Sequence, residues 1–294
     1  MSHGPDPWQQ TAWDLRAAAN FVCGGAGAGL IVFAALAQAA GVPATLPFAC
    51  GAVLVAAGLV AVWFEIGRPL RALNVFRHPR RSWMSREAIA AALLLPTAIA
   101  AALGVSGCAA AAALAALAFV CCQARIVQAA RGIPAWRVPQ VVPLLVTTAL
   151  AEGGALYLAS ALVHGGTAAP LLLLAGVLVL ARWAAWLAYR RALGTSGSAP
   201  ARAALDAAAA ALQWTGTLAP LVLLALALGF AIATGSALDA MAPIVAVALA
   251  GAGALAGGAW LKVVLVTRAA FNQGFALAAL PVRGVPRRAG DRTP

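Results

Sequence analysis

The sequence predicts an all-α integral membrane protein that has eight transmembrane helices and both termini in the cytoplasm. Three observations predict this fold class: the composition, the length of the apolar runs and the one-sided distribution of the basic residues. Of the 294 residues, 63% are hydrophobic and 10% are charged, whereas about a quarter of the residues of an average soluble domain are charged. A soluble protein of this composition would lack the polar residues to cover its surface. A disordered chain would have much less apolar surface.

The apolar runs are each about 20 residues long, which is the length that crosses the hydrocarbon core of a bilayer. Because backbone polar groups in lipid must be satisfied within the segment, and no alternating pattern indicates a barrel, each run is predicted to be a helix. Residues 1–16 are polar, and no cleavable signal peptide is expected. We treat residues 1–294 as a single transmembrane anchor domain. The predicted spans are residues 17–40, 46–66, 87–104, 107–129, 139–162, 169–190, 213–234 and 241–266.

The basic residues are gathered on one side of these spans. The chain has 20 basic and 8 acidic residues, and its formal net charge is +12. With the N-terminus on one side, every Lys and Arg falls on that side or near the adjoining helix ends, and the opposite loops contain none. The positive-inside rule predicts that this side is cytoplasmic. The excess charge therefore indicates membrane orientation and contact with membrane lipid, and we expect no nucleic-acid partner.

The residue inventory limits the chemistry that this chain performs alone. None of the three His residues lies inside a predicted span, so a haem held by two imidazoles is not expected. The five Cys residues lack the spacing of iron–sulfur or zinc ligands, and no metal site is predicted. The glycines of the first span lack the strand and the Lys-Ser/Thr pair of a phosphate loop, and they are typical of close helix packing. Redox work would therefore need a bound organic carrier or a partner.

The most informative segment connects the second span to the third. Glu65 lies at the end of the second span, Glu87 opens the third, and six Arg residues lie between them. A structural interpretation treats Ser85 as a helix N-cap with Glu87 as a first-turn acid. It treats the Arg residues as an orientation signal and as contacts to lipid headgroups.

A functional interpretation of the same segment adds Asn20 of the first span and Arg125 of the fourth, which we expect at similar depth. A quinone headgroup needs hydrogen-bond donors for its two carbonyl oxygens and an acid–base group for its protons. Asn and Arg side chains donate hydrogen bonds, and a carboxylate near a basic cluster exchanges protons with water. These four residues fit a quinone site near the cytoplasmic interface, but the set alone is not specific for quinone, and the structural interpretation stays an equal alternative.

Two blocks of the sequence resemble the DmsC branch of the DmsC/NrfD membrane-anchor family. The first block is Gly67-Arg68-Pro69, Arg71-Ala72-x-Asn74 and Ser82-Trp83-x-Ser85-x-Glu87, and the second is Arg125-Ile126 followed by Ile133-Pro134-Ala135-Trp136. The resemblance implies a haem-free anchor subunit of a molybdenum or tungsten oxidoreductase. It further implies a menaquinone or ubiquinone cofactor, a four-cluster ferredoxin-like iron–sulfur subunit and a molybdopterin catalytic subunit as partners.

Carried over position by position, the quinone-linked acid of the family is Glu87. The residue that is often His in the family is Glu65 here, which is a departure, because a Glu relays protons but is not a ready cationic donor. Arg68, Arg71 and Asn74 match the loop motif and are expected to support the site or to dock the iron–sulfur subunit. Trp83, Ser85 and Arg125 complete the candidate cofactor-binding residues, together with Asn20.

The predicted cytoplasmic site favours quinone reduction with electrons from a cytosolic substrate, in the inner membrane of a bacterium. The opening segment from Trp13 to Gly25 is similar to anchors associated with phenylacetyl-CoA:acceptor oxidoreductases, with sulfite-oxidising complexes as the runner-up. A quinol-oxidising anchor of the dimethyl sulfoxide reductase type is the main alternative. A transporter and a structural tether are the remaining alternative functions. The transporter is disfavoured because we expect only one deep charge, Glu152, and no interrupted helix pair at the midplane.

Overall fold

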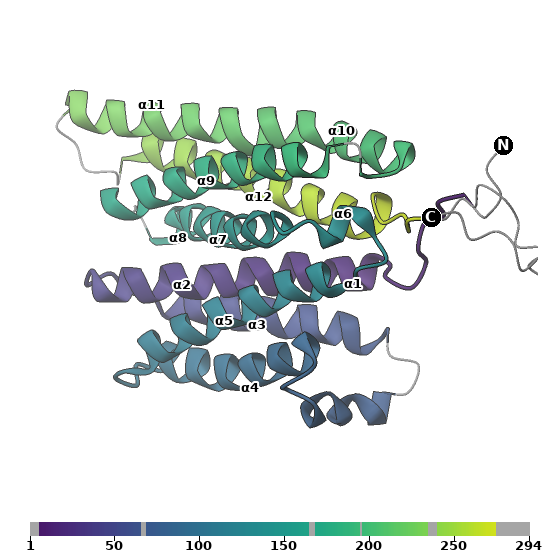
Figure 1. Cartoon of the computed structure of the whole chain (residues 1–294). Helices are drawn as coiled ribbons and strands as arrows, with labels where there is room; N and C mark the ends of the chain where they lie inside the picture. The colour runs from purple at the N-terminus through teal and green to yellow at the C-terminus, as the bar shows by residue number, and fades with distance from the viewer. Residues whose placement is uncertain (1–5, 66–68, 165–167, 195, 235–239, 275–294) are drawn as a thin grey trace, which may run out of the picture.

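The computed structural model describes residues 6–65, 69–164, 168–194, 196–234 and 240–274, and Figure 1 shows these residues folded as a helical bundle. Within them, eight helical segments are long and apolar enough to cross a membrane, which confirms the predicted all-α, multi-pass fold. The first four spans contain α1 (Leu15–Ala19), the π-helix η1 (Asn20–Gly24), α2 (Gly25–Ala39), α3 (Thr45–Trp63), α4 (Trp83–Ala102) and α5 (Cys108–Ala129), with the 3-10 helix η2 (Pro69–Arg77) between α3 and α4.

The remaining four spans come after a short connecting helix. The fifth and sixth are single helices. The seventh has one π-helical turn between two α-helices, and the eighth ends in a π-helical turn. The elements are α6 (Pro134–Arg137), α7 (Val141–Ala159), α8 (Ala161–His164), α9 (Ala169–Leu193), α10 (Ala199–Gln213), η3 (Trp214–Leu218), α11 (Ala219–Thr234), α12 (Met241–Val263) and η4 (Val264–Arg268).

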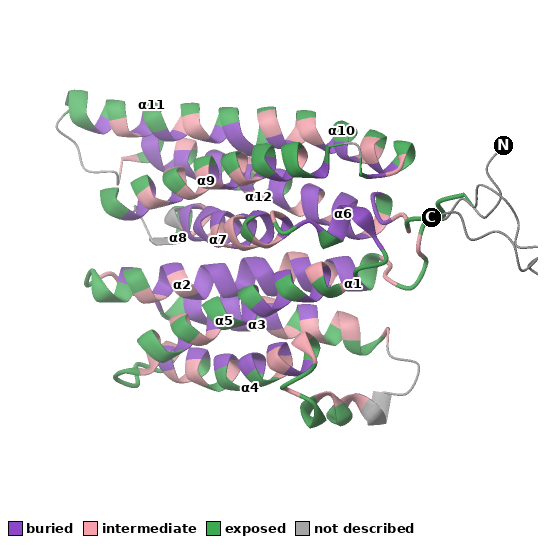
Figure 2. Ribbon diagram, viewed as in Figure 1, coloured by how far each residue is buried: buried purple, intermediate pink, exposed green. Residues whose placement is uncertain are grey.

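The bundle is organised around α2 and α7, which pack against each other at its centre. In Figure 1, α2 joins α3, α4 and α5 in one half of the bundle, and α7 joins α9, α11 and α12 in the other. Buried residues follow the inner sides of these helices, as Figure 2 shows. Outward side chains such as Leu93, Leu226 and Ile232 are exposed, as expected for surfaces that face lipid.

Two glycines allow the central helices to approach closely. Gly29 of α2 and Gly153 of α7 face each other, and a Cβ atom on either residue would overlap the backbone of the opposite helix. Small residues at such contacts let transmembrane helices pack backbone to backbone. The interpretation of the glycines in the first span as packing residues is therefore confirmed at Gly29.

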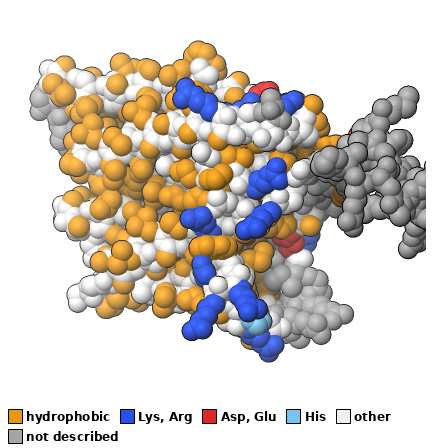
Figure 3. Space-filling view, in the orientation of Figure 1, with side chains coloured by type: hydrophobic (Ala, Val, Ile, Leu, Met, Phe, Trp, Pro, Cys, Tyr) orange, Lys and Arg blue, Asp and Glu red, His pale blue; other side chains and the backbone are white. Residues whose placement is uncertain are grey.

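The described arginines concentrate toward one end of the bundle, where α4 begins and α5 ends. Figure 3 shows Lys and Arg side chains gathered over the right-hand part of the visible face. We call this the basic end. The N-terminal and C-terminal segments meet there, because the backbone nitrogen of Trp8 donates to Oδ1 of Asn272 at 3.0 Å and Gln9 forms an isolated β-bridge with Phe271. Its exposed arginines include Arg77, Arg81, Arg131, Arg137 and Arg191.

One predicted loop is helical instead. Residues 191–212 were expected to lie outside the spans, yet α10 begins at Ala199 and continues through η3 into α11. Alanine has the highest helix propensity, and the Ser198 hydroxyl oxygen accepts a hydrogen bond from the backbone nitrogen of Ala201 at 3.4 Å. Leu205 and Leu212 are buried on one side of α10, so this alanine-rich helix is an amphipathic extension of the seventh span.

Candidate functional site

A pocket of about 270 Å³ opens at the basic end among the first four spans. It brings together three of the predicted site residues, Asn20, Glu65 and Glu87, from η1, the segment after α3, and α4. We call it the Glu87 pocket. Its lining residues are Trp13, Ala17, Asn20, Phe21, Val62, Glu65, Met84, Glu87 and Ile126.

Asn20 is held in place by contacts from three directions. Its side chain is buried, and its Nδ2 donates a hydrogen bond to Oε1 of Glu87 at 3.2 Å. The Nε2 of Gln123 in α5 donates to the backbone oxygen of Asn20 at 3.1 Å. Gly58 of α3 leaves room for this arrangement, because a Cβ atom there would lie 3.1 Å from Oδ1 of Asn20. Asn20 begins the π-helical turn η1, and such turns are frequent at functional sites.

Glu87 is a buried pocket residue, so the interpretation of Glu87 as a first-turn acid behind an N-cap at Ser85 is wrong. The helix begins one turn earlier, at Trp83, and its N-cap is Ser82, whose hydroxyl oxygen accepts from the backbone nitrogen of Ser85 at 3.3 Å. This shift places Glu87 in the second turn of α4, where its side chain is 8% exposed. Within the described residues, its carboxyl group accepts a hydrogen bond from the Asn20 amide and forms no ion pair with a cation.

Glu65 lies two residues beyond α3 and is half-buried at the pocket edge. Burial raises the pKa of its carboxyl group, and the negative charge of Asp14 raises it further, whereas Arg16 lowers it. Arg16 also ties the first span to this segment, because its Nη1 donates to the backbone oxygen of Phe64 at 2.9 Å. Glu65 is therefore the carboxyl group between the buried part of the pocket and the surface.

The pocket combines apolar walls with few polar groups. The Trp13 and Phe21 rings lie with their centroids 5.9 Å apart, and Val62, Met84 and Ile126 add aliphatic surface. Oδ1 of Asn20 is buried and has no hydrogen-bond partner among the described residues. Binding sites for flat organic molecules commonly have this character. The arrangement can hold an aromatic ring, donate or accept a hydrogen bond at Asn20, and exchange protons at two carboxyl groups.

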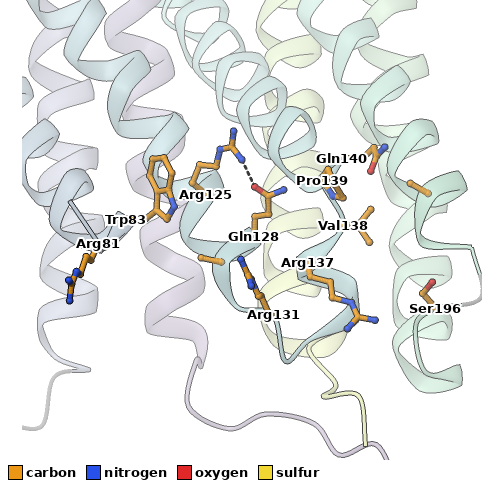
Figure 4. Close-up of a pocket in the computed structure, with 12 residues that line it drawn as sticks. Arg81, Trp83, Arg125, Gln128, Arg131, Arg137, Val138, Pro139, Gln140 and Ser196 are labelled. Carbon is orange, nitrogen blue, oxygen red and sulfur yellow. Dashed lines mark hydrogen bonds between the residues drawn. The ribbon is translucent and has the colours of Figure 1, made fainter. Parts of the chain in front are cut away.

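Two predicted site residues, Trp83 and Arg125, line a different and larger cavity. This cavity has a volume of about 910 Å³ and lies beside the Glu87 pocket at the basic end. The guanidinium carbon of Arg125 lies 5.7 Å from the centroid of the Trp83 ring. We call this larger cavity the arginine cavity, and Figure 4 shows its residues. It is lined by Arg81, Trp83, Arg125, Gln128, Ala129, Arg131, Arg137, Val138, Pro139, Gln140, Ala192 and Ser196.

The other loop residues are separate from the Glu87 pocket or lie outside the described part. Asn74 is exposed on η2. Arg68 lies outside the described residues, as does the side chain of Arg71. Ser85 is buried in α4 but is not among the pocket-lining residues.

The structure contains a cluster of buried charged side chains that the sequence did not predict. Besides Glu152, the structure buries Arg182 of α9 and Lys262 of α12, so the expectation of one deep charge is wrong. Lys262 Nζ lies 2.5 Å from Oε2 of Glu152 and donates to the backbone oxygen of Phe21 at 2.7 Å. The sequence predicts every Lys and Arg on one side or near the adjoining helix ends. Arg182 and Lys262 lie deeper than that, because α9 continues to Leu193 and η4 extends the last span to Arg268. The signal in the sequence was Lys262 itself, the one Lys of the chain, inside an apolar run.

Comparison with known proteins adds no assignment. The chain matches no protein-family model, and no curated protein is significantly similar to it in sequence. Among the described residues, no group of three or more His, Cys, Asp or Glu side chains is placed to hold a metal ion.

Proposed function

We propose that this chain is the haem-free membrane anchor of a molybdenum or tungsten oxidoreductase of the DmsC/NrfD type. In this proposal, the Glu87 pocket binds a quinone or quinol. The bound molecule exchanges electrons with an iron–sulfur subunit that docks at the basic end. That subunit in turn serves a molybdopterin catalytic subunit. The anchor itself holds no catalytic metal.

One observation carries the proposal: two carboxyl groups and a buried amide line one apolar pocket at the basic end. The volume of about 270 Å³ suits a quinone ring rather than a whole prenylated molecule. The unpartnered Oδ1 of Asn20 can accept a hydrogen bond from a quinol hydroxyl. A buried acceptor without a partner is costly, so a ligand that donates to it gains affinity.

The two carboxyl groups would divide the proton work. A quinone takes up two electrons and two protons when it is reduced to quinol. Glu87, buried beside Asn20, is the group that passes protons to or from the ring oxygens. Glu65, half-buried at the pocket edge, exchanges protons with water and returns Glu87 to its starting state.

The charge distribution supports an orientation. If the basic end faces the cytoplasm, as the positive-inside rule requires, both described chain ends lie on that side of a bacterial inner membrane. The catalytic subunit would then act on a cytosolic substrate and deliver electrons to quinone. Oxidation of quinol for a terminal reductase uses the same pocket in the opposite direction.

The direct test is Glu87→Gln in the assembled complex, purified from native membranes. Quinone-coupled turnover should be lost, because the amide cannot transfer a proton. Turnover with a soluble artificial electron acceptor should persist, since the catalytic subunit is intact. The matched control is Asp206→Asn, which neutralises an acidic residue in α10 outside the pocket and should leave quinone-coupled turnover unchanged. Full quinone-coupled turnover in Glu87→Gln would contradict the proposed proton role.

A second candidate, a transporter, is favoured by the buried cluster of Glu152, Arg182 and Lys262. Ionisable side chains inside a membrane bundle commonly mark ion or substrate pathways. Purification of the tagged chain under mild conditions separates the two candidates. Iron–sulfur and molybdopterin proteins that co-purify in fixed stoichiometry support the anchor, whereas isolation as a lone protein supports the transporter.

A further inference from the structure

The arginine cavity concentrates positive charge without a counter-charge. Four arginines line it, and no acidic side chain does. Within the described residues, none of the four forms an ion pair with a carboxylate, because the ion pairs of this part of the chain involve Arg16, Arg190 and Lys262 instead. A cavity of about 910 Å³ in which every charged side chain is positive is suited to an anion.

The cavity lies at the level where the spans end, which is the headgroup region of a bilayer. Arg125 is exposed and stands four residues before the end of α5 at Ala129. Arg131 and Arg137 follow that end, and Trp83 begins α4 from the same side. Basic pockets between transmembrane helices at this level bind phosphate-containing lipid headgroups, and Trp is enriched at the same depth.

An exposed apolar strip runs from Arg125 along the outside of α5. Cys121, Leu117 and Leu114 precede Arg125 by 4, 8 and 11 positions, so they lie on the same helix face. Leu114 is 69% exposed and Leu117 is 36% exposed. A soluble acidic partner would not reach this strip inside the hydrocarbon layer, whereas a lipid acyl chain lies there naturally.

The polar groups of the cavity indicate the kind of headgroup. Figure 4 shows Nη1 of Arg125 donating to Oε1 of Gln128, a distance of 2.6 Å. Oε1 of Gln140 is buried and has no hydrogen-bond partner among the described residues. It therefore needs a donor, which a glycerol hydroxyl supplies and a choline group does not.

We propose that the arginine cavity is a binding site for an anionic phospholipid with a glycerol headgroup, such as phosphatidylglycerol or cardiolipin. The phosphodiester contacts Arg125, Arg131 and Arg137, a headgroup hydroxyl donates to Gln140, and one acyl chain follows Leu117 and Leu114. The site is distinct from the Glu87 pocket and does not depend on the redox proposal.

Native mass spectrometry of the purified full-length protein, titrated with phosphatidylglycerol or phosphatidylcholine, tests this site. Phosphatidylglycerol should bind the wild type at least about tenfold more tightly. Since each basic residue beside the bound anionic headgroup contributes about fivefold to its affinity, the triple variant Arg125→Gln, Arg131→Gln, Arg137→Gln should lose about 100-fold. The charge-matched control Arg77→Gln, Arg80→Gln, Arg191→Gln changes residues that do not line the cavity, so it should remain within about threefold of the wild type. Equal losses in both triple variants, or no lipid preference in the wild type, would overturn the proposal.

Two further arms distinguish the source of the anion. Inorganic phosphate and deacylated glycerophosphoglycerol should displace the lipid only weakly, because neither occupies the apolar strip. Leu114→Asn with Leu117→Asn should weaken phosphatidylglycerol binding in the wild-type arginine background. Full displacement by phosphate would identify a free-anion site instead. A triple arginine variant that keeps its lipid but loses an acidic partner protein would identify a protein-docking surface instead.

Discussion

The Nζ atom of Lys262 in α12 lies 2.5 Å from Oε2 of Glu152 in α7, and both side chains are buried inside the bundle. The same Nζ atom donates to the backbone oxygen of Phe21, which lines the Glu87 pocket. Arg182 lies on the other side of Glu152, next to Gly258, and donates to the backbone oxygens of Ala254 and Gly216. The ion pair therefore connects the centre of the bundle to the wall of the candidate site.

Removal of one partner of this pair should destabilise the protein strongly. Glu152 is the carboxylate that faces both Lys262 and Arg182, so Glu152→Gln leaves two buried cations without a counter-charge. Removing one partner of a buried ion pair costs about 3–5 kcal/mol. The thermal unfolding midpoint in detergent should fall sharply for Glu152→Gln and recover in part in the double variant Glu152→Gln with Lys262→Met, in which only Arg182 remains charged. A double variant as unstable as Glu152→Gln alone would contradict this interpretation.

Gly153→Ala should separate α2 from α7. A Cβ atom at Gly153 overlaps the backbone of Gly29, and the backbone cannot yield without moving a helix. Overpacking typically costs about 1–3 kcal/mol. The matched control is Gly229→Ala in α11, where a Cβ atom meets nothing within 4 Å. The control should be neutral or stabilising by up to about 1 kcal/mol, because Ala is the better helix former.

Asn20→Ala should weaken ligand binding at the proposed quinone site. The substitution removes the donor to Glu87 and the unpartnered Oδ1, so a quinol bound as proposed would lose one hydrogen bond. A hydrogen bond contributes about 1 kcal/mol, which corresponds to about a fivefold rise in the dissociation constant of a quinol analogue. Calorimetric titration of the purified protein with the quinol analogue measures this dissociation constant. Gln38→Ala, an exposed amide at the other end of the first span, should leave the affinity unchanged.

Glu65 should make stability depend on pH. Because burial raises the pKa of this carboxyl from its ordinary value of 4.5, the folded protein favours the protonated form. Its contribution to stability is therefore fully present below pH 4.5 and is lost as the pH rises through the raised pKa. The unfolding midpoint of the wild type relative to Glu65→Gln should fall over that window. A flat difference across the window, or the same trend in Asp206→Asn, would contradict the prediction.

The separation of Arg125 from Glu87 shows how far sequence reasoning reaches at the site. Depth along each helix was predictable, because it follows from counting residues from the span ends, and both residues do lie near the basic end. The direction of each side chain around its helix axis was not, because nearly every face of these helices is apolar. The structure turns Glu87 inward to Asn20 and leaves Arg125 exposed beside Trp83.

By itself, the sequence determined the all-helical fold, the eight spans and the separation of charged from apolar segments, because burial of apolar residues in lipid depends on composition and length. Tertiary structure alone decided which polar groups meet. Asn20 and Glu87 are 67 positions apart, and Glu152 and Lys262 are 110 positions apart. Such contacts depend on the rotation and close approach of whole helices, which small residues such as Gly29 and Gly153 permit and which no local pattern encodes.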